Sequence, residues 1–358
     1  MKRKHIASIF LLMAAALILS ACGLTQVQDT DVSNGYDSAS ISEEVSELYV
    51  YYIDVGQSDA ALIVCDGKAM LIDGGNAGDS SLIYSFLEKR GIAHLDYIVA
   101  THAHEDHIGG LAGALNYATV GTALCPVTEY DSKAFGNFVK YLGAQGVPIT
   151  VPEHGDTFKI GSADVMVVGP INQSSAANNT SIVLKVTYGE TSFLFTGDAE
   201  RALEQDILEA GYDISATVLK VGHHGSDTST TYPFLREIMP EYAVISCGKG
   251  NQYGHPNEDL LSRLRDADVA VYRTDMQGTI VCHSDGETVS FSVERNANAE
   301  TNHTQHSVGE GYYIGNKNSL KFHRPSCSGL PAENNRVVLV TLDAAISGGF
   351  EPCGTCKP

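Results

Sequence analysis

A short stretch of this chain carries four side chains that can bind metal ions. His102, His104, Asp106 and His107 lie within six residues, directly after the apolar run at 97–100. Neighbouring side chains on a helix diverge by about 100°, so a helix cannot aim all four at one point. A tight loop at the end of a strand can divide them between two adjacent ions. The spacing therefore predicts a dinuclear metal site.

Two more apolar runs end in residues of the same chemistry. Asp198 follows the run at 193–195, and His223 and His224 follow the run at 218–221. In α/β proteins, sites form at the carboxyl ends of strands. We therefore expect three strand ends to converge on one metal centre.

The order and spacing of these motifs resemble a known family. His-x-His-x-Asp-His at 102–107, Gly-Asp at 197–198 and His-His-Gly-Ser at 223–226 are similar to the motifs of the metallo-β-lactamase superfamily. The resemblance covers residues 48–293 and implies an α/β fold, the αββα sandwich of two sheets between helices. The apolar runs agree with this expectation, because hairpins alternate with βα units.

Three further motifs resemble one branch of that superfamily, typified by the hydrolase domain of the competence proteins ComEC and Rec2. They are Asp-Val-Gly-Gln-Ser-Asp-Ala at 54–60, Asn-Asn-Thr-Ser at 178–181 and Asn-Gln-Tyr-Gly-His-Pro at 251–256. Ser58 stands where that branch usually has a second glycine. A tight turn tolerates this change when φ stays negative.

The resemblance also implies which side chains hold the two ions, and it leaves the choice between the adjacent histidines at 223 and 224 open. Asp198 is expected to bridge the ions. The ions are expected to be zinc or manganese, since imidazole and carboxylate ligands suit both. The expected ligands are His102 and His104 for the first ion, and Asp106, His107 and either His223 or His224 for the second.

One departure from the superfamily bears on the substrate. Asn178, Asn179 and Ser181 stand in the stretch expected to supply a further histidine ligand. One ion should therefore be held less fully by protein, which leaves room for substrate oxygens, and we expect these three residues to bind substrate. Phosphodiester hydrolysis is the expected chemistry, because such a site suits a phosphoester better than a β-lactam.

Four residues are expected to take part in the reaction itself. Two adjacent ions lower the pKa of a shared water, so hydrolysis at neutral pH is expected. Asp106 would orient that water while it binds metal, and Asp198 would hold both ions. Lys220 or His255 is expected to stabilise charge or to protonate the leaving oxygen.

The net charge of the chain limits the substrates that it can bind. A formal net charge of -20 and a pI near 4.9 repel polyanions unless bound metal reverses the local field. A surface nuclease or phosphodiesterase that acts on DNA or related phosphodiesters is still the first hypothesis, because of the ComEC-like motifs. The alternatives are a hydrolase of another surface phosphoester, such as a phosphocholine or teichoic-acid decoration, and a non-catalytic DNA-binding or uptake accessory lipoprotein.

The amino terminus has the charge and hydropathy order of an export signal. Basic residues at 2–4 precede the apolar run at 6–21, which is too short for a comfortable membrane span. Leu-Ser-Ala-Cys at 19–22 resembles the lipobox of bacterial lipoproteins, which implies cleavage before Cys22 and lipidation of its sulfur. A plain signal peptide or an uncleaved anchor is the alternative.

These features predict where the protein resides. Residues 1–21 would be a lipoprotein signal peptide, and residues 22–46 are too polar to order themselves, so we expect a disordered tether. The mature protein would be exported and held by the lipid on Cys22 at the outer face of the cytoplasmic membrane.

The end of the chain contains a second set of metal-ligand residues, His323-x3-Cys327 and Cys353-x2-Cys356. This is the spacing of a zinc knuckle, and so small a unit needs such a staple. The block 312–358 is similar to the small metal-binding module of Ada-type DNA repair proteins, in which the ligands are all cysteines. We expect one structural zinc there, with a disulfide as the alternative.

Composition divides the rest of the chain. A hydrolase domain is expected at 47–294, followed by a polar, structure-poor linker at 295–311. Cys65, Cys247 and Cys282 lie in apolar runs without paired spacing, so we expect buried free thiols.

Overall fold

The computed structural model describes the hydrolase domain and most of the carboxyl-terminal module. The predicted signal peptide (1–21), the tether (22–46) and the lipidation site Cys22 lie outside the described residues, so these stay predictions. Within the described part, no helix combines the length and the apolar character that a membrane crossing requires. The described ranges are 47–302, 313–325, 327–339, 345 and 348–356.

The first sheet has eight strands, and its middle strands are buried on both faces. All five side chains of β2 (Ala61–Cys65) are buried. A two-residue turn, Asp66-Gly67, joins β2 to β3 (Lys68–Ile72), and both turn residues have the positive φ that such hairpins require, +48° and +74°. β2 and β3 therefore form one of the hairpins that the apolar runs predict. The strand order is β15 (Val289–Val293), β14 (Ile280–Ser284), β1 (Leu48–Tyr52), β2, β3, β4 (His94–Val99), β5 (Thr119–Leu124) and β6 (Ile149–Thr150).

The second sheet has seven strands and, like the first, contains both parallel and antiparallel pairs. Strands β10 to β13 pair in parallel, and β7 to β10 pair antiparallel. In the first sheet, β3 to β6 are the parallel strands. The order is β13 (Ala270–Arg273), β12 (Tyr242–Ile245), β11 (Val218–Lys220), β10 (Thr191–Phe195), β9 (Val183–Tyr188), β8 (Ala163–Gly169) and β7 (Thr157–Ile160).

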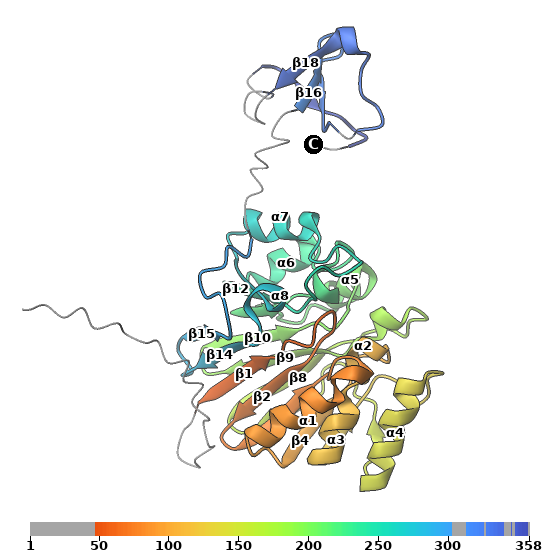
Figure 1. The fold of residues 1–358 in the computed structure, drawn as a ribbon, viewed down its shortest axis with the longest axis vertical. Helices are drawn as coiled ribbons and strands as arrows, with labels where there is room; N and C mark the ends of the chain where they lie inside the picture. Colours follow the sequence, from red (N-terminus) through yellow and green to blue (C-terminus); the bar gives the residue numbers. More distant parts are fainter. Residues whose placement is uncertain (1–46, 303–312, 326, 340–344, 346–347, 357–358) are drawn as a thin grey trace, which may run out of the picture. The chain divides into compact units, whose positions relative to one another are not determined.

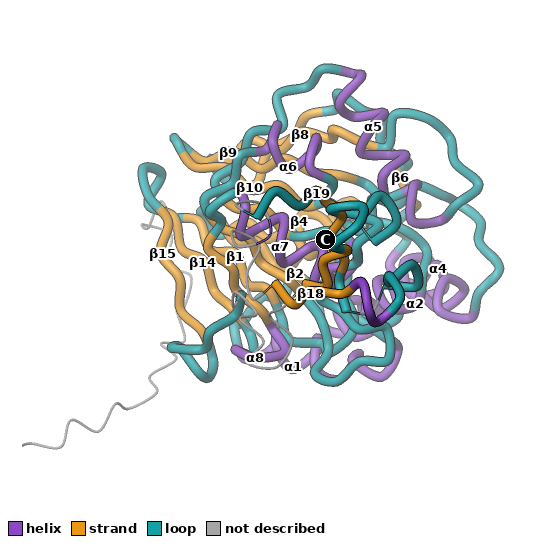
Figure 2. Tube along the Cα trace, turned by 90° about the horizontal axis from the view of Figure 1, so that it is seen from above, coloured by secondary structure: helices purple, strands orange, loops and turns teal. Residues whose placement is uncertain are grey.

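The two sheets pack face to face, and helices cover their outer faces (Figures 1 and 2). The middle layer is apolar, and the rings of Tyr52 and Phe195 stack across it at 6.0 Å between centroids. Each sheet also has one further apolar cluster between it and the helices on its outer face. The predicted αββα sandwich is confirmed. The helices are α1 (Ser80–Lys89), α2 (Glu105–Ile108), α3 (Leu111–Tyr117) and α4 (Lys133–Gln145) beside the first sheet, and α5 (Arg201–Ala210), α6 (Tyr232–Ile238), α7 (Glu258–Asp266) and α8 (Thr274–Gln277) in the second half of the domain.

The start of the predicted linker is in contact with the hydrolase domain. Thr301 is buried and donates a hydrogen bond from its hydroxyl to the Val271 carbonyl oxygen. The Asn302 side chain donates to the Leu261 carbonyl oxygen at 3.2 Å. Thr301 and Asn302 therefore pack on β13 and α7, and the contacts of the domain extend past 294.

The carboxyl-terminal module is a separate small sheet with little apolar core. Its strand order is β18 (Arg336–Leu339), β16 (Tyr313–Asn316), β17 (Lys321–His323) and β19 (Glu351–Pro352). The buried apolar cluster consists of Phe322, Leu339 and Ala345 among the residues that the structure describes. So small a core adds little free energy of folding, which is consistent with a need for a metal staple.

Two helical glycines differ in what surrounds them. Gly113 in α3 lies against α1, and a Cβ added there would come within 1.8 Å of the Ser80 carbonyl oxygen. A Cβ added at Gly136, on the exposed side of α4, would meet no atom within 4 Å. The first glycine is required for close packing of α1 on α3, and the second is not.

These surroundings predict opposite effects of alanine. Gly113→Ala should lower the free energy of unfolding by about 1–3 kcal/mol or more, because the helices must separate. Gly136→Ala should raise it by about 0.5–1 kcal/mol, because alanine loses less backbone entropy in a helix. Chemical denaturation of both variants measures the difference, and a neutral Gly113→Ala would contradict the packing described here.

Candidate metal centre

Three buried side chains form the middle of the centre. His102 follows β4, His107 lies in α2, Asp198 follows β10, and their ligand atoms all lie within 4.8 Å of one another. His107 Nε2 is 3.2 Å from Asp198 Oδ1, and His102 Nε2 is 3.9 Å from Asp198 Oδ2. A carboxylate from the second sheet thus faces two imidazoles from the first.

A second set of ligand atoms overlaps the first. Asp106, His107 and His224 also have ligand atoms within 4.8 Å of one another. His224 Nε2 is 3.3 Å from Asp106 Oδ2 and 3.7 Å from Asp198 Oδ2. Asp198 therefore lies within reach of both sets, which is the arrangement expected for two adjacent ions.

The two adjacent histidines point to different partners. Both have positive φ, +50° at His223 and +52° at His224, which non-glycine residues adopt rarely. His224 is buried in the second set, whereas the His223 side chain is 23% exposed, and its Nδ1 lies 3.3 Å from Glu200 Oε1. His223 Nε2 is 3.7 Å from Asp198 Oδ2. His224 is thus the member of the pair that belongs with Asp106 and His107.

His104 lies at the edge of the first set. Its Nδ1 is 3.0 Å from His102 Nε2. Two nitrogens bound to one tetrahedral zinc at about 2.0–2.1 Å are separated by about 3.3 Å. The pair is therefore close to the spacing of two ligands of one ion, although His104 is outside the tight groups found among the described residues.

Two buried carboxylates that the sequence analysis did not assign orient the imidazoles. His107 Nδ1 is 2.8 Å from Asp73 Oδ2, and His224 Nδ1 is 3.1 Å from Asp59 Oδ1. With Nδ1 engaged, each ring presents Nε2 to the centre. Asp73 directly follows the apolar strand β3, and Asp59 lies in the 54–60 motif, so a search for carboxylates after strands would have found Asp73.

Lys220 contacts one of these carboxylates. Its Nζ donates to Asp59 Oδ2 at 2.8 Å and to the Val221 carbonyl oxygen at 2.9 Å, and the side chain is 4% exposed. Lys220 therefore acts on the centre through Asp59 and His224, as a positioning residue. The direct role expected for it at a leaving oxygen stays a prediction.

The charged groups of the centre shift one another's ionisation. Burial opposes charge on Asp198, but His107, His224 and His102 outweigh it and hold the Asp198 pKa well below its usual range. Burial also opposes charge on His224, yet Asp198 and Asp59 raise its pKa to about 10. Burial and the neighbouring His107 lower the pKa of His102. The carboxylates thus require positive charge in the middle of the cluster.

The donor set fits divalent cations. His107 Nε2 and Asp198 Oδ1 are buried and lie 3.2 Å apart as an ion pair, but neither atom makes a hydrogen bond. An unpaired buried polar atom costs about 1–3 kcal/mol, and imidazole nitrogen with carboxylate oxygen is a common ligand set for zinc and manganese. Bound cations would satisfy both atoms.

The stretch with the two asparagines supports the loop that carries Asp198. The Ser181 hydroxyl accepts a hydrogen bond from the Asp198 N–H at 3.0 Å, and Asn179 Oδ1 accepts from the Glu200 N–H at 3.1 Å. Asn178 Nδ2 donates to Glu200 Oε1 at 3.3 Å, while its Oδ1 has no hydrogen-bond partner. Substrate binding by these residues stays a prediction, and Asn178 has unused hydrogen-bonding capacity for it.

His255 borders the centre through His223. The two rings lie 5.7 Å apart, and His255 Nδ1 is 3.2 Å from Gln57 Nε2. Burial, followed by the neighbouring His223 and His224, lowers the pKa of His255. Its expected role as proton donor stays a prediction.

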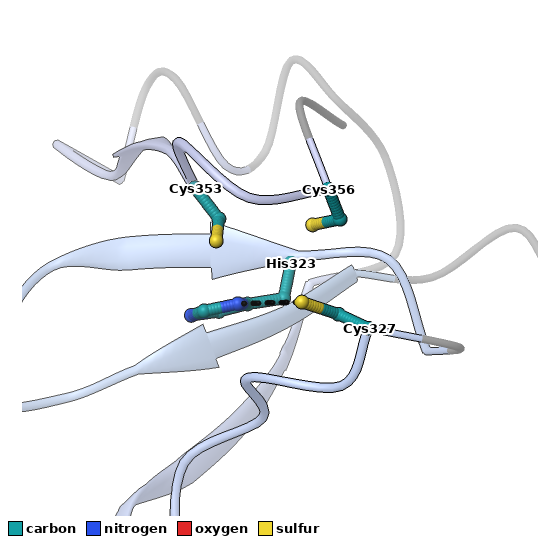
Figure 3. Close-up of side chains that lie close together, drawn as sticks. All are labelled: His323, Cys327, Cys353 and Cys356. Atoms are coloured by element: carbon teal, nitrogen blue, oxygen red, sulfur yellow. Dashed lines mark hydrogen bonds between the residues drawn. The ribbon is translucent and has the colours of Figure 1, made fainter.

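The carboxyl-terminal module brings its four predicted ligands together (Figure 3). Parallel pairing of β17 with β19 sets His323 beside Cys353, and the Cys353 N–H donates to the Phe322 carbonyl oxygen at 2.9 Å. The four ligand atoms lie within 4.8 Å of one another, and the three cysteines are free. This Cys3His cluster fits a structural zinc. The residues of the cluster are His323, Cys327, Cys353 and Cys356.

The other described cysteines have no partner of this kind. Cys65, Cys247 and Cys282 are buried free thiols, as predicted, and so is Cys125.

Together, the αββα sandwich and the overlapping His/Asp ligand sets are those of a metal-dependent hydrolase. Residues 53–249 match the metallo-beta-lactamase superfamily, and the chain belongs to this superfamily. Residues 298–358 match the metal binding domain of Ada, which confirms the predicted Ada-like module.

Comparison with known proteins also confirms the predicted branch. The chain is 33% identical to ComE operon protein 3 of Bacillus subtilis over 267 residues, 69% of this chain and 34% of that protein. It is 29% identical to competence protein ComA of Neisseria gonorrhoeae over 238 residues, 66% of this chain and 32% of that protein. The chain thus spans about a third of the length of these relatives. The solved structure of YhfI from Bacillus subtilis, a metallo-beta-lactamase fold protein, matches with a TM-score of 0.45 and 14% identity over 67% of this chain and all of YhfI.

Asp73→Asn should weaken metal binding by about 10–100-fold without unfolding the protein. The amide keeps the shape of the side chain but no longer favours the tautomer in which His107 presents Nε2 to the centre. Competition with a chromophoric chelator measures the affinity. Asp164→Asn on β8 is the matched control, since that side chain is 69% exposed and its ion pair with Lys159 lies on the surface. Equal affinities in the two variants would show that Asp73 does not orient the ligand.

Replacing one thiol of the carboxyl-terminal cluster should release one zinc ion per chain. Cys353→Ser leaves three ligands, which hold zinc more weakly than four. Atomic absorption after dialysis gives the count, with Cys282→Ala as the control because Cys282 is a buried free thiol in β14 that belongs to no ligand group among the described residues. An unchanged count in Cys353→Ser, with a disulfide seen by mass spectrometry of the wild type, would contradict a zinc site.

Proposed function

We propose that this protein hydrolyses phosphodiester bonds in DNA or a related nucleic acid, and that the lipid on Cys22 holds it at the outer face of the cytoplasmic membrane. The observation that carries the proposal is Asp198, which lies within reach of two ligand sets, one with His102 and the other with His224. Two cations side by side suit a phosphodiester, whose reaction moves charge onto several oxygens.

Side chains around the centre favour a substrate with several oxygens. Bound cations lower the pKa of water and neutralise phosphoryl oxygens. Asn178 Nδ2 donates to Glu200, which leaves its amide oxygen, without a hydrogen-bond partner, to accept from a substrate hydroxyl or a water. Asp106, whose side chain is 35% exposed, borders solvent and the second ligand set, so it can orient an entering water.

The relatives support nucleic acid as the substrate. The name of one relative refers to competence and that of another to the ComE operon. The similarity extends over 69% of this chain for the ComE operon protein and 66% for the competence protein. The superfamily match at 53–249 includes the segments that contain Asp59 and Asn178. The lipid anchor is supported by the lipobox-like sequence that ends at Cys22.

The full chain, supplied with zinc or manganese, should hydrolyse single-stranded DNA and bis-p-nitrophenyl phosphate. Asp198→Ala should reduce both rates by more than about a hundredfold, which exceeds the loss typical of residues that only orient ligands. Asp164→Ala is the control, because it removes an exposed carboxylate of the same kind and should leave both rates unchanged. Product release measured by gel and by absorbance gives both rates.

Two other outcomes of this experiment would favour the alternative functions. Turnover of the small diester without any cleavage of DNA would favour another surface phosphoester, such as a phosphocholine or teichoic-acid decoration. DNA binding that persists in Asp198→Ala, with no turnover by the wild type, would favour a non-catalytic accessory protein.

A further inference from the structure

Two tyrosine rings that are exposed to solvent border the metal centre through different histidines. Tyr130, between β5 and α4, is 39% exposed, and its ring lies edge-on to His104 at 6.4 Å between centroids. Tyr253, between β12 and α7, is 63% exposed and stacks on His255 at 5.7 Å. The His255 ring in turn lies 5.7 Å from His223. One exposed ring therefore borders the centre beside His104, and another borders it beside His255 and His223.

The loop that carries Tyr253 is held in place from two directions. Asn251 Oδ1 accepts hydrogen bonds from the backbone N–H groups of Tyr253 at 3.1 Å and His255 at 3.0 Å. Gln57, from the loop after β1 in the other sheet, accepts from the Gly248 N–H at 2.9 Å. A side chain on a fixed loop loses less entropy when it binds a ligand. The exposed ring is thus presented on a backbone that is already ordered.

The charge of the chain disfavours recognition of nucleic acid through its phosphates. A net charge of -20 repels a phosphate backbone, and duplex binding depends on many lysine and arginine contacts. The chain near Tyr130 and Tyr253 holds one exposed lysine each, Lys133 and Lys249. Aromatic stacking needs no basic surface, but it needs bases that are not already stacked in a duplex.

We propose that Tyr130 and Tyr253 stack on unpaired bases of a nucleic-acid strand and thereby select single strands over duplexes. The inference rests on the proposed nuclease function, since both rings border the centre at which the phosphodiester would be cleaved. The two tyrosines determine specificity, and the metal ligands hold the scissile group.

The test measures binding to oligonucleotides in a form that the protein cannot cleave. The full chain with zinc is titrated into a fluorescent thymidine strand with cleavage-resistant linkages, into a strand of equal length with abasic sites, and into a duplex. Wild type should bind the thymidine strand at least about tenfold more tightly than either alternative. Tyr130→Ala and Tyr253→Ala should each lose about tenfold on the thymidine strand and nothing on the abasic strand. Tyr253→Phe should retain the wild-type affinity, because the ring remains.

Two controls separate stacking from general effects. Tyr84→Ala removes a ring of similar exposure, 37%, which packs on Tyr117 between α1 and α3, and it should leave all affinities unchanged. Raising salt from about 50 to 200 mM should weaken binding less than about tenfold, whereas proteins with six to ten phosphate contacts lose about 10³–10⁵-fold.

Failure of this inference is distinguishable from failure of the proposed function. Equal binding of thymidine and abasic strands, or equal losses on both in the tyrosine variants, overturns stacking. Turnover of ordinary strands is measured separately. Base-dependent binding without turnover overturns the nuclease function and leaves the stacking surface in place.

Discussion

Burial of negative charge between the two sheets is the constraint on which the rest of the site depends. Asp198, Asp59 and Asp73 are 2%, 5% and 1% exposed. A buried charge without a partner costs about 3–5 kcal/mol, so each carboxylate must meet a positive group. Lys220 and His224 meet Asp59, His107 meets Asp73, and these imidazoles together with His102 surround Asp198.

This constraint explains the local backbone of the site. The parallel strands of each sheet end at the same edge, so residues after β3, β4, β10 and β11 can reach one place. Two successive left-handed residues, His223 and His224, turn one ring inward and the other toward Glu200. Ser181 fixes the Asp198 backbone from the neighbouring strand connection. The positive φ angles of His223 and His224 cost free energy, and the pairing of His224 with the buried carboxylates of Asp59 and Asp198 offsets that cost.

The sequence was sufficient for the parts of this arrangement that depend on local pattern. Apolar runs predicted the strands around the first ligands, and ligand spacing predicted the clusters at 102–107 and at the carboxyl terminus. The sequence was insufficient where two side chains that contact each other in the site lie far apart along the chain. Nothing local in the sequence indicates that Lys220 pairs with Asp59, 161 residues away. The choice between His223 and His224 likewise depended on two backbone dihedral angles, which residue types do not determine.

The origin of the ligands has a consequence for the lifetime of the folded chain. His102 and His107 come from the half of the domain built on the first sheet, and Asp198 and His224 come from the other half. A cation between them is bound by the native state and not by the separated halves, so binding shifts the folding equilibrium by mass action. A ligand present at a hundred times its dissociation constant adds about 2.7 kcal/mol per site. The surrounding metal supply therefore adds to the cohesion that the apolar layer between the two halves provides, and metal scarcity would raise the fraction of chains open to proteolysis.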